Sequence, residues 1–374
     1  MRIYKLRPSA ASTWIRCHGQ PRMLEGIPVE QDDEDVEVRE EGTACHWAAH
    51  QLALGHSVPL DTIAPNGVPI DEDMLNAART WIDETRSWGQ DVNPAYEQPL
   101  HCAWIHDECG GVTDGCGYSP SKRTLYIGDL KYGFRFVDVQ ENWQLICYFA
   151  GALAHYGLND LDTWVEFVIV QPRSYHRDGP IRRWRVHASE LRGQINQLRG
   201  AADAALGVAV SPVMLTVNKG CGRCAARFRC TAAQDAALDG VDSAFEATPH
   251  DLPFAAAEDE LRRLQWARDA LEARITGLEG QVSYHMRKGA ISRHFELKAK
   301  AGREIWKEGE FERAQNMARL YGVELTKPPQ PITPTQAKTK LPPFVVEQFS
   351  HRPHGALKLV PSDASVWRRI FGKH

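Results

Sequence analysis

The sequence predicts an α/β protein with a mixed central sheet flanked by helices. Three segments alternate as β-strands do, Ala95–Ile105, Gly111–Tyr118 and Thr124–Lys131, and the short turns between them require antiparallel neighbours. A helix is expected over Asp138–Tyr156, and Thr163–Val170 is the most strongly β-branched segment of the chain. A strand, a helix and a strand that follow a hairpin indicate a mixed sheet covered by helices.

Helices are also expected before the sheet. Ser12–Leu24 is predicted as a short helix, and Gly42–Leu54 and Asp71–Trp88 have the spacing of amphipathic helices. Between the first two lies Glu30–Glu41, which carries eight carboxylates and one arginine. Such a run is typical of a solvated loop.

The C-terminal third has a different pattern. Leucine, isoleucine and valine recur at intervals of three, four or seven between Leu261 and Val282, which predicts a helix of roughly 30 residues. A surface helix docked on the first domain is favoured over a coiled-coil dimer. Lys327–Pro343 is rich in proline and is interpreted as an extended linker with one short helix. The predicted domains are residues 1–239, 240–326 and 327–374.

Composition restricts the class of protein. The chain has 374 residues, of which 43% are hydrophobic and 25% charged, as in ordinary globular proteins. It has no apolar run near the roughly 20 residues that cross a bilayer and no apolar signal peptide, so an intracellular protein without a membrane partner is expected. The formal net charge is −4, yet Ser283–His374 holds 17 basic and 8 acidic side chains. This basic extension suits non-specific contact with DNA.

A second basic segment lies at Arg173–Arg185. Guanidinium groups there stand beside Tyr175 and Trp184, a combination that suits a phosphate backbone with unstacked bases. A solvated hairpin explains the segment equally well. The arginines predicted to contact DNA are Arg173, Arg182, Arg183 and Arg185.

Cysteine spacing indicates a metal site. In a reducing compartment nine cysteines are not expected to form disulfides, and five of them are scattered singly through core segments. Cys221, Cys224 and Cys230 instead form C-x2-C-x5-C without apolar periodicity, which favours metal ligands.

The strongest catalytic signal comes from two neighbouring strands. Asp129 and Lys131 share one face of their strand, and Asp114 of the preceding strand can reach that face if the two strands pair. Two carboxylates beside an ammonium can hold Mg²⁺ or Mn²⁺ and position a group for phosphodiester hydrolysis. An exposed cross-strand pair is the simpler interpretation of such a triplet, but the apolar neighbours Leu125 and Ile127 favour a buried strand.

These residues resemble the PD-(D/E)xK nuclease core in its RecB-type branch, which has a restriction-endonuclease-like fold. The resemblance is carried by G-x-x-D ending at Asp114, D-L-K ending at Lys131, G-x-x-x-H ending at His46, and Q-x-x-x-Y from Gln144 to Tyr148. It implies that Asp114, Asp129 and Lys131 are catalytic. It further implies a metal site of His46, Asp114, Asp129 and the backbone carbonyl of Leu130, with Glu97 as an additional ligand, and a role for Gln144 and Tyr148 in contacting DNA or supporting the site.

The cysteines extend this resemblance to RecB-type nucleases that carry an iron–sulfur cluster, among them CRISPR-adaptation exonucleases and AddB-like proteins. In those proteins one early cysteine joins a late trio, which would here be Cys17 with Cys221, Cys224 and Cys230. Four thiolates suit a [4Fe-4S] cluster or structural zinc, and spacing alone does not separate the two. Either would act as a staple that closes the two ends of the nuclease domain.

As a whole the chain resembles a family of bacteriophage and prophage nucleases. The resemblance implies a Mg²⁺- or Mn²⁺-dependent exonuclease for single-stranded or frayed DNA ends in the cytoplasm of a bacterial host. Its partners would be DNA and other phage recombination or replication proteins. One alternative is a DNA-binding recombination or assembly protein with little cleavage of its own, and another is a zinc-stapled hydrolase that acts on a different substrate.

Overall fold

The computed structural model describes residues 2–27, 36–174, 176–207, 214–245, 252–295 and 297. The chain divides into two compact units, residues 1–328 and 329–374. The second unit lies outside the described residues, as do the Pro-rich segment and most of the basic extension. No helix in the described ranges combines the length and the apolar character needed to span a membrane.

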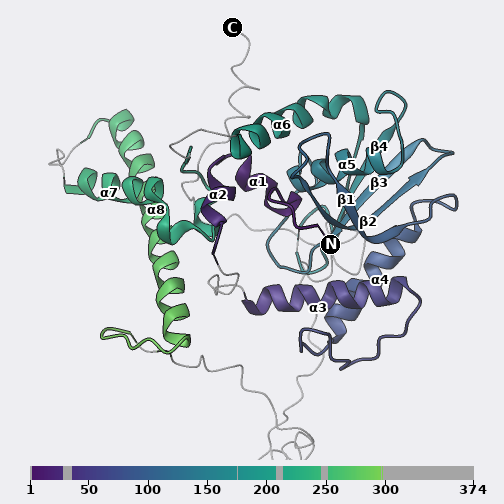
Figure 1. Ribbon diagram of the computed structural model, residues 1–374, viewed down its shortest axis with the longest axis horizontal. Coiled ribbons are helices and arrows are strands. Elements are labelled where there is room, and N and C mark those ends of the chain that lie inside the picture. Colours follow the sequence, from purple (N-terminus) through teal and green to yellow (C-terminus); the bar gives the residue numbers. More distant parts are fainter. Residues whose placement is uncertain are drawn as a thin grey trace, which may run out of the picture. The chain divides into compact units, whose positions relative to one another are not determined.

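The first unit contains a five-stranded mixed sheet in the order β1-β2-β3-β4-β5 (Figure 1). β1, β2 and β3 are antiparallel, β3 and β4 are parallel, and β5 returns antiparallel to β4. The predicted α/β class with a mixed sheet is therefore confirmed. The strands are β1 (Ala95–His101), β2 (Gly110–Ser119), β3 (Thr124–Leu130), β4 (Trp164–Val170) and β5 (Ile181–His187).

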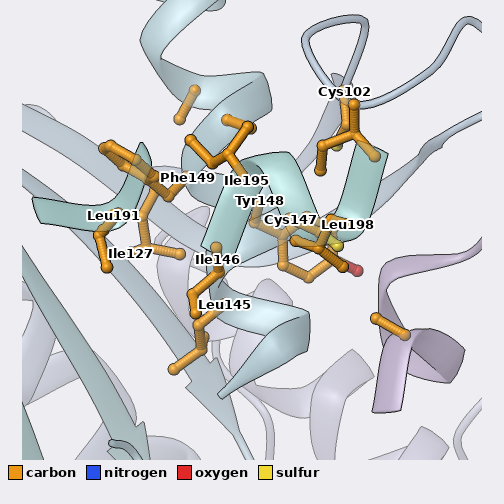
Figure 2. Packing of buried hydrophobic residues seen from close by; sticks show 14 of the residues in the cluster. Cys102, Ile127, Leu145, Ile146, Cys147, Tyr148, Phe149, Leu191, Ile195 and Leu198 are labelled. Atoms are coloured by element: carbon orange, nitrogen blue, oxygen red, sulfur yellow. The ribbon is translucent and has the colours of Figure 1, made fainter. Parts of the chain in front are cut away.

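One face of the sheet packs on α5 (Trp143–His155) and α6 (Arg192–Leu206). Asn142 begins α5 by accepting hydrogen bonds from the two amides at positions 144 and 145. α5 makes the crossover that a parallel β3–β4 pair requires. Its apolar side chains meet alternate residues of the strands, including Ile127, and side chains of α6, including Ile195 and Leu198 (Figure 2). This cluster is the larger of the cores that cover the sheet.

The opposite face packs on α3 (Val36–Ala53) and α4 (Glu72–Arg86). Tyr126 and Leu130 of β3 point to this face because they alternate with the residues that meet α5. Asp71 caps α4 by accepting a hydrogen bond of 2.7 Å from the amide of Met74. Figure 1 shows α3 and α4 on the side of the sheet away from α6.

Glycines allow α4 to approach the sheet closely. A Cβ atom at Gly128 would lie 2.5 Å from Cη2 of Trp81, and one at Gly115 would lie 2.7 Å from Cζ2 of the same ring. These two glycines are paired across β2 and β3. The indole of Trp81 therefore rests on bare backbone, one residue from the aspartates predicted to be catalytic.

Two predictions before the sheet are wrong. Ser12–Leu24 is not one helix, because α1 (Ala11–Trp14) ends early and α2 (Gln20–Leu24) begins anew. Pro21 fits the new start at α2, since it has no amide hydrogen to continue a helix but suits a first turn. The acidic run is not a loop throughout, because α3 starts at Val36; residues 30–35 lie outside the described ranges.

After the sheet, α7 (Thr231–Phe245) and α8 (Phe254–Arg287) form a helical pair. The long helix predicted from the leucine spacing is confirmed, and it packs on α7 and on the short turns η4 (Cys221–Arg223) and η5 (Arg227–Arg229). The predicted domain boundary between residues 239 and 240 falls inside α7.

Candidate metal centre

Asp114 lies where β2 and β3 stop pairing. The antiparallel register of the two strands ends at Gly115 opposite Gly128. Beyond that pair the Asp114 side chain replaces a backbone partner, since its Oδ2 accepts a hydrogen bond of 2.7 Å from the amide of Leu130. One carboxylate oxygen is thereby fixed by the sheet, and the other lies near α3.

Three potential ligands from three elements meet at this point. Nδ1 of His46 on α3 is 3.4 Å from Oδ1 of Asp114. Glu97 of β1 joins them, and one ligand atom from each residue lies within 4.8 Å of the other two. Among the described residues no other three His, Cys, Asp or Glu side chains are this close together. An imidazole nitrogen and two carboxylate oxygens at such distances can share one divalent cation.

Glu97 has an unusual backbone conformation. Its φ is 48°, although it lies within a β-strand. Its neighbours keep the register with β2, which places Glu97 opposite Asp114. A positive φ at a residue other than glycine costs about 1–3 kcal/mol and persists only where the surroundings hold it. The sequence gives no indication of this backbone conformation. It brings the carboxylates of Glu97 and Asp114 close together.

Asp129 and Lys131 form a second group with Gln144 of α5. Nζ of Lys131 is 2.8 Å from Oδ2 of Asp129 and donates a hydrogen bond of 3.2 Å to Oε1 of Gln144. The Gln144 amide in turn donates to Oδ1 of Asp129 at 2.6 Å. Asp129 is only 2% exposed, and its Oδ2 accepts no hydrogen bond of good geometry from the described residues. Asp129 thus lies beside the compact set of three ligands and holds the ammonium.

The charges of the two groups are coupled. Burial raises the pKa of Asp129, and the Lys131 ammonium offsets this in part. Burial opposes the charged forms of Lys131 and His46, but the Asp129 and Asp114 carboxylates outweigh it, raising the pKa of Lys131 and bringing that of His46 to about 9. Burial and the Asp114 carboxylate raise the pKa of Glu97. Three carboxylates thus face the Lys131 ammonium and the His46 imidazole, whose nitrogen binds a metal ion only after it has lost its proton.

The potential ligands line a small cavity. Leu130, whose backbone carbonyl was predicted as a ligand, lies on its wall with His46 and Asp114. His50 lines it too, one helical turn after His46 on the same face of α3. His50 was not among the predicted residues, although the H-x-x-x-H spacing would have indicated it.

The predicted Q-x-x-x-Y motif supports the site from α5. Gln144 binds the Asp129 and Lys131 side chains, as described above. Tyr148 is buried and its hydroxyl donates a hydrogen bond of 2.6 Å to the carbonyl of Val112 in β2. Both side chains therefore hold the strands that carry the acidic residues.

All four predicted cysteine ligands line one cavity. Cys17 and the C-terminal trio Cys221, Cys224 and Cys230 surround it together. Sγ of Cys17 accepts a hydrogen bond of 3.5 Å from the amide of Thr216, across 199 residues of sequence. Burial raises the pKa of Cys221, and raises that of Cys224 to about 11, with the neighbouring thiols adding to the effect. Thiols whose pKa is raised in this way lose their protons when a metal binds them.

Hydrogen bonds join the same two regions of the chain. The amide of Gly19 donates a hydrogen bond of 2.8 Å to the carbonyl of Met214. The guanidinium of Arg22 donates to the carbonyl of Gly207, also at 2.8 Å. The segment after Cys17 is therefore fixed to the segment before Cys221 by hydrogen bonds of the protein itself.

The distances between the four sulfur atoms can be compared with those of a zinc site. Tetrahedral zinc with Zn–S bonds of about 2.3 Å brings its four sulfurs to about 3.8 Å from one another. No three of these four described sulfurs lie within 4.8 Å of one another. The four thiols are therefore not at the spacing of a tetrahedral zinc site.

The four predicted DNA-binding arginines have different surroundings. Arg173 is paired with Glu41 at 2.7 Å, and Arg183 with the buried Glu84. The guanidinium of Arg185 lies over the ring of Trp164, 5.0 Å from its centre. Arg182 is 4% exposed and donates its hydrogen bonds to the protein. Tyr175 lies outside the described residues.

A comparison with models of protein families finds a match that covers most of the chain. A family model described as "Protein of unknown function (DUF2800)" matches residues 4–365. The chain therefore belongs to the DUF2800 family.

Proposed function

We propose that this member of the DUF2800 family is a nuclease that uses Mg²⁺ or Mn²⁺ to hydrolyse DNA. The observation that carries the proposal is the meeting of His46, Glu97 and Asp114 beside a buried aspartate–lysine pair. Imidazole and carboxylate ligands suit divalent cations, and a fixed ammonium suits the charge of a phosphodiester. The resemblance of these residues to PD-(D/E)xK nucleases of the RecB type supports the same function.

The residues fit a divalent cation. The donor set has the chemistry of such a site, because one imidazole nitrogen and two carboxylate oxygens lie within 4.8 Å of one another. His46, Glu97 and Asp114 would hold the ion, with Asp129 and the carbonyl of Leu130 at its border. The imidazole nitrogen of His46 favours Mn²⁺ over Mg²⁺, because Mg²⁺ is usually bound by oxygen ligands. When bound, such an ion lowers the pKa of water and neutralises phosphate charge.

Lys131 has a separate role. Its raised pKa keeps it an ammonium at neutral pH, so it acts as a hydrogen-bond donor and not as a base. Asp129 and Gln144 hold Nζ in place, which lets it orient a phosphoryl oxygen and stabilise the negative charge that develops during attack.

Binding of the substrate would use basic groups around this centre. Arg173 and Arg185 stand with aromatic rings, and the C-terminal region has a positive charge balance. Non-specific contacts of this kind depend strongly on salt. We propose single-stranded or frayed DNA ends as the substrate, the bacterial cytoplasm as the location, and phage recombination or replication proteins as partners.

The cysteine cavity would hold a [4Fe-4S] cluster. Its four thiols come from both ends of the sheet domain, and four cysteine thiolates are the usual ligands of such a cluster. The cluster would be structural, because it would reinforce hydrogen bonds that already join these segments.

A nuclease assay tests the proposal. The unaltered chain with Mn²⁺ is expected to release nucleotides from a labelled DNA strand, whereas Asp129→Ala and Lys131→Ala lose about 100-fold or more. Asp83→Ala, which removes an aspartate of α4, is a control that should keep activity. Equal activity in all three variants would reject the site. DNA binding without metal-stimulated cleavage would favour a DNA-binding role.

A further inference from the structure

The loop after β3, residues 131–137, begins at Lys131 and carries two exposed aromatic rings. Phe134 is 58% exposed and Phe136 is 38% exposed. Contact between an apolar ring and water is unfavourable, and a ligand that covers the ring removes this cost. The position of the two rings matters because the loop begins at Lys131, a proposed catalytic residue.

The loop is held rigidly in spite of its exposure. The buried amide of Gln171 donates to the carbonyls of Gly133 and Arg135, at 2.8 and 2.5 Å. Its oxygen accepts from the amide of Val137 at 3.1 Å. The buried Arg182 donates to both the Gln171 oxygen and the Val137 carbonyl, at 2.6 and 2.9 Å. Alternate backbone carbonyls thus point to the protein and fix the two phenylalanines that lie between them.

The ring of Phe134 is also fixed, on one face. The guanidinium of Arg173 lies 3.8 Å from its centre and 4.4 Å from the centre of the buried Tyr132 ring. Arg173 is itself held by Glu41 of α3, the helix that carries His46. A ring that remains 58% exposed with one face covered has its opposite face open.

We infer that Phe134 is a stacking surface for an unpaired base of the DNA strand that enters the site, with Phe136 beside it. This inference rests on the proposed nuclease function and names the feature that selects single strands. An aromatic face binds any base, whereas in a duplex the faces of the bases are already stacked. Phe136 has His176 stacked on it at 4.1 Å, which leaves Phe134 as the principal surface.

The distance to the proposed centre agrees with this arrangement. Three residues of extended chain between Lys131 and Phe134 span at most about 10 Å. Three nucleotides of a stacked strand, at about 3.4 Å each, are long enough to cover that distance. A base on Phe134 would therefore hold a phosphate of the same strand near Lys131.

Binding of two strands with equal charge tests the inference. Fluorescence anisotropy without added divalent ions would compare a short oligothymidine with an abasic strand of the same length. Phe134→Ala is expected to weaken binding of oligothymidine by about 5- to 100-fold, the range that stacking of one base gives. Binding of the abasic strand should not change. Phe134→Trp, which keeps an aromatic ring, should bind oligothymidine as the unaltered chain does. Phe254→Ala, which removes a phenylalanine 84% exposed at the start of α8, is the matched control.

The outcomes separate the inference from the function on which it rests. Equal losses on both strands, or no loss on either, would overturn the stacking role, even if the unaltered chain cleaves DNA with Mn²⁺. If the unaltered chain neither binds nor cleaves the oligothymidine, both the stacking role and the nuclease function are wrong. Unchanged binding of the abasic strand also shows that Phe134→Ala is folded.

Discussion

The Asp114 carboxylate accepts a hydrogen bond of 2.7 Å from the backbone amide of Leu130, at the point where β2 and β3 separate. One oxygen of this side chain thus completes the sheet, while the other lies near His46. A single residue therefore joins the stability of the strand pair to the geometry of the proposed metal site. Two substitutions should separate these contributions.

Asp114→Asn keeps an oxygen that can accept from Leu130 but removes the charge. We expect it to abolish metal binding in calorimetry while the free energy of unfolding in urea changes little. Asp114→Ala should lose metal binding and also about 1–3 kcal/mol of stability, because the buried amide has no acceptor. Equal stability of the two variants would show that the hydrogen bond to Leu130 contributes nothing.

Glu97→Gln should stabilise the metal-free protein. Burial and the Asp114 carboxylate raise the pKa of Glu97, so its ionised form is unfavourable in the folded state. Removing one of two like charges opposite each other on neighbouring strands should add about 0.2–1 kcal/mol at neutral pH. Affinity for Mn²⁺, measured by calorimetry, should fall in the same variant. Unchanged affinity would exclude Glu97 as a ligand.

Gly128→Ala should destabilise the protein by about 1–3 kcal/mol, because the added methyl group would meet the Trp81 ring at 2.5 Å. The indole is packed between α4 and the sheet and cannot yield freely. Gly193→Ala is the matched control, since no atom lies within 4 Å of the added group and the residue is helical. It should be neutral or add up to about 1 kcal/mol. Urea unfolding of both variants tests the contrast, and equal effects would contradict it.

Cys17→Ser should remove bound iron and the visible absorbance of sulfur-to-iron charge transfer, while Cys116→Ala should keep both. Cys116 is buried in the core of the sheet and does not line the cysteine cavity. Iron analysis and absorption spectra of anaerobically purified protein measure the difference. Bound zinc in place of iron in the unaltered chain would exclude the cluster.

Elements with a strong pattern could be predicted from the sequence, and elements with a weak one could not. The alternation of β2 and β3 and the apolar run of β4 were sufficient to predict a mixed sheet. α6 was missed, although Ile195 and Leu198 on its buried face have helical spacing; the rest of that face is alanine, as at Ala201 and Ala202. α7, also rich in alanine, was missed as well.

The site was only partly visible in the sequence. Spacing along one strand was sufficient to place Asp129 beside Lys131, since the alternation of a strand is local. The compact set of His46, Glu97 and Asp114 depends on the packing of α3 and on the positive φ of Glu97. Arg182 was predicted to contact DNA, but the fold buries it beneath the loop that carries Phe134. Such roles follow from tertiary contacts that no local pattern encodes.

The hydrogen bond from Arg22 to the carbonyl of Gly207 closes a separation of 185 residues. On a ribosome that adds about 5–20 residues each second, the partner is made roughly 10–40 s after the arginine. This hydrogen bond can therefore form only after the whole sheet, which lies between the two residues in the sequence, has been synthesised. Until then, contacts such as that between Leu6 and Cys109 are the ones that can hold the segment before Arg22 on the sheet.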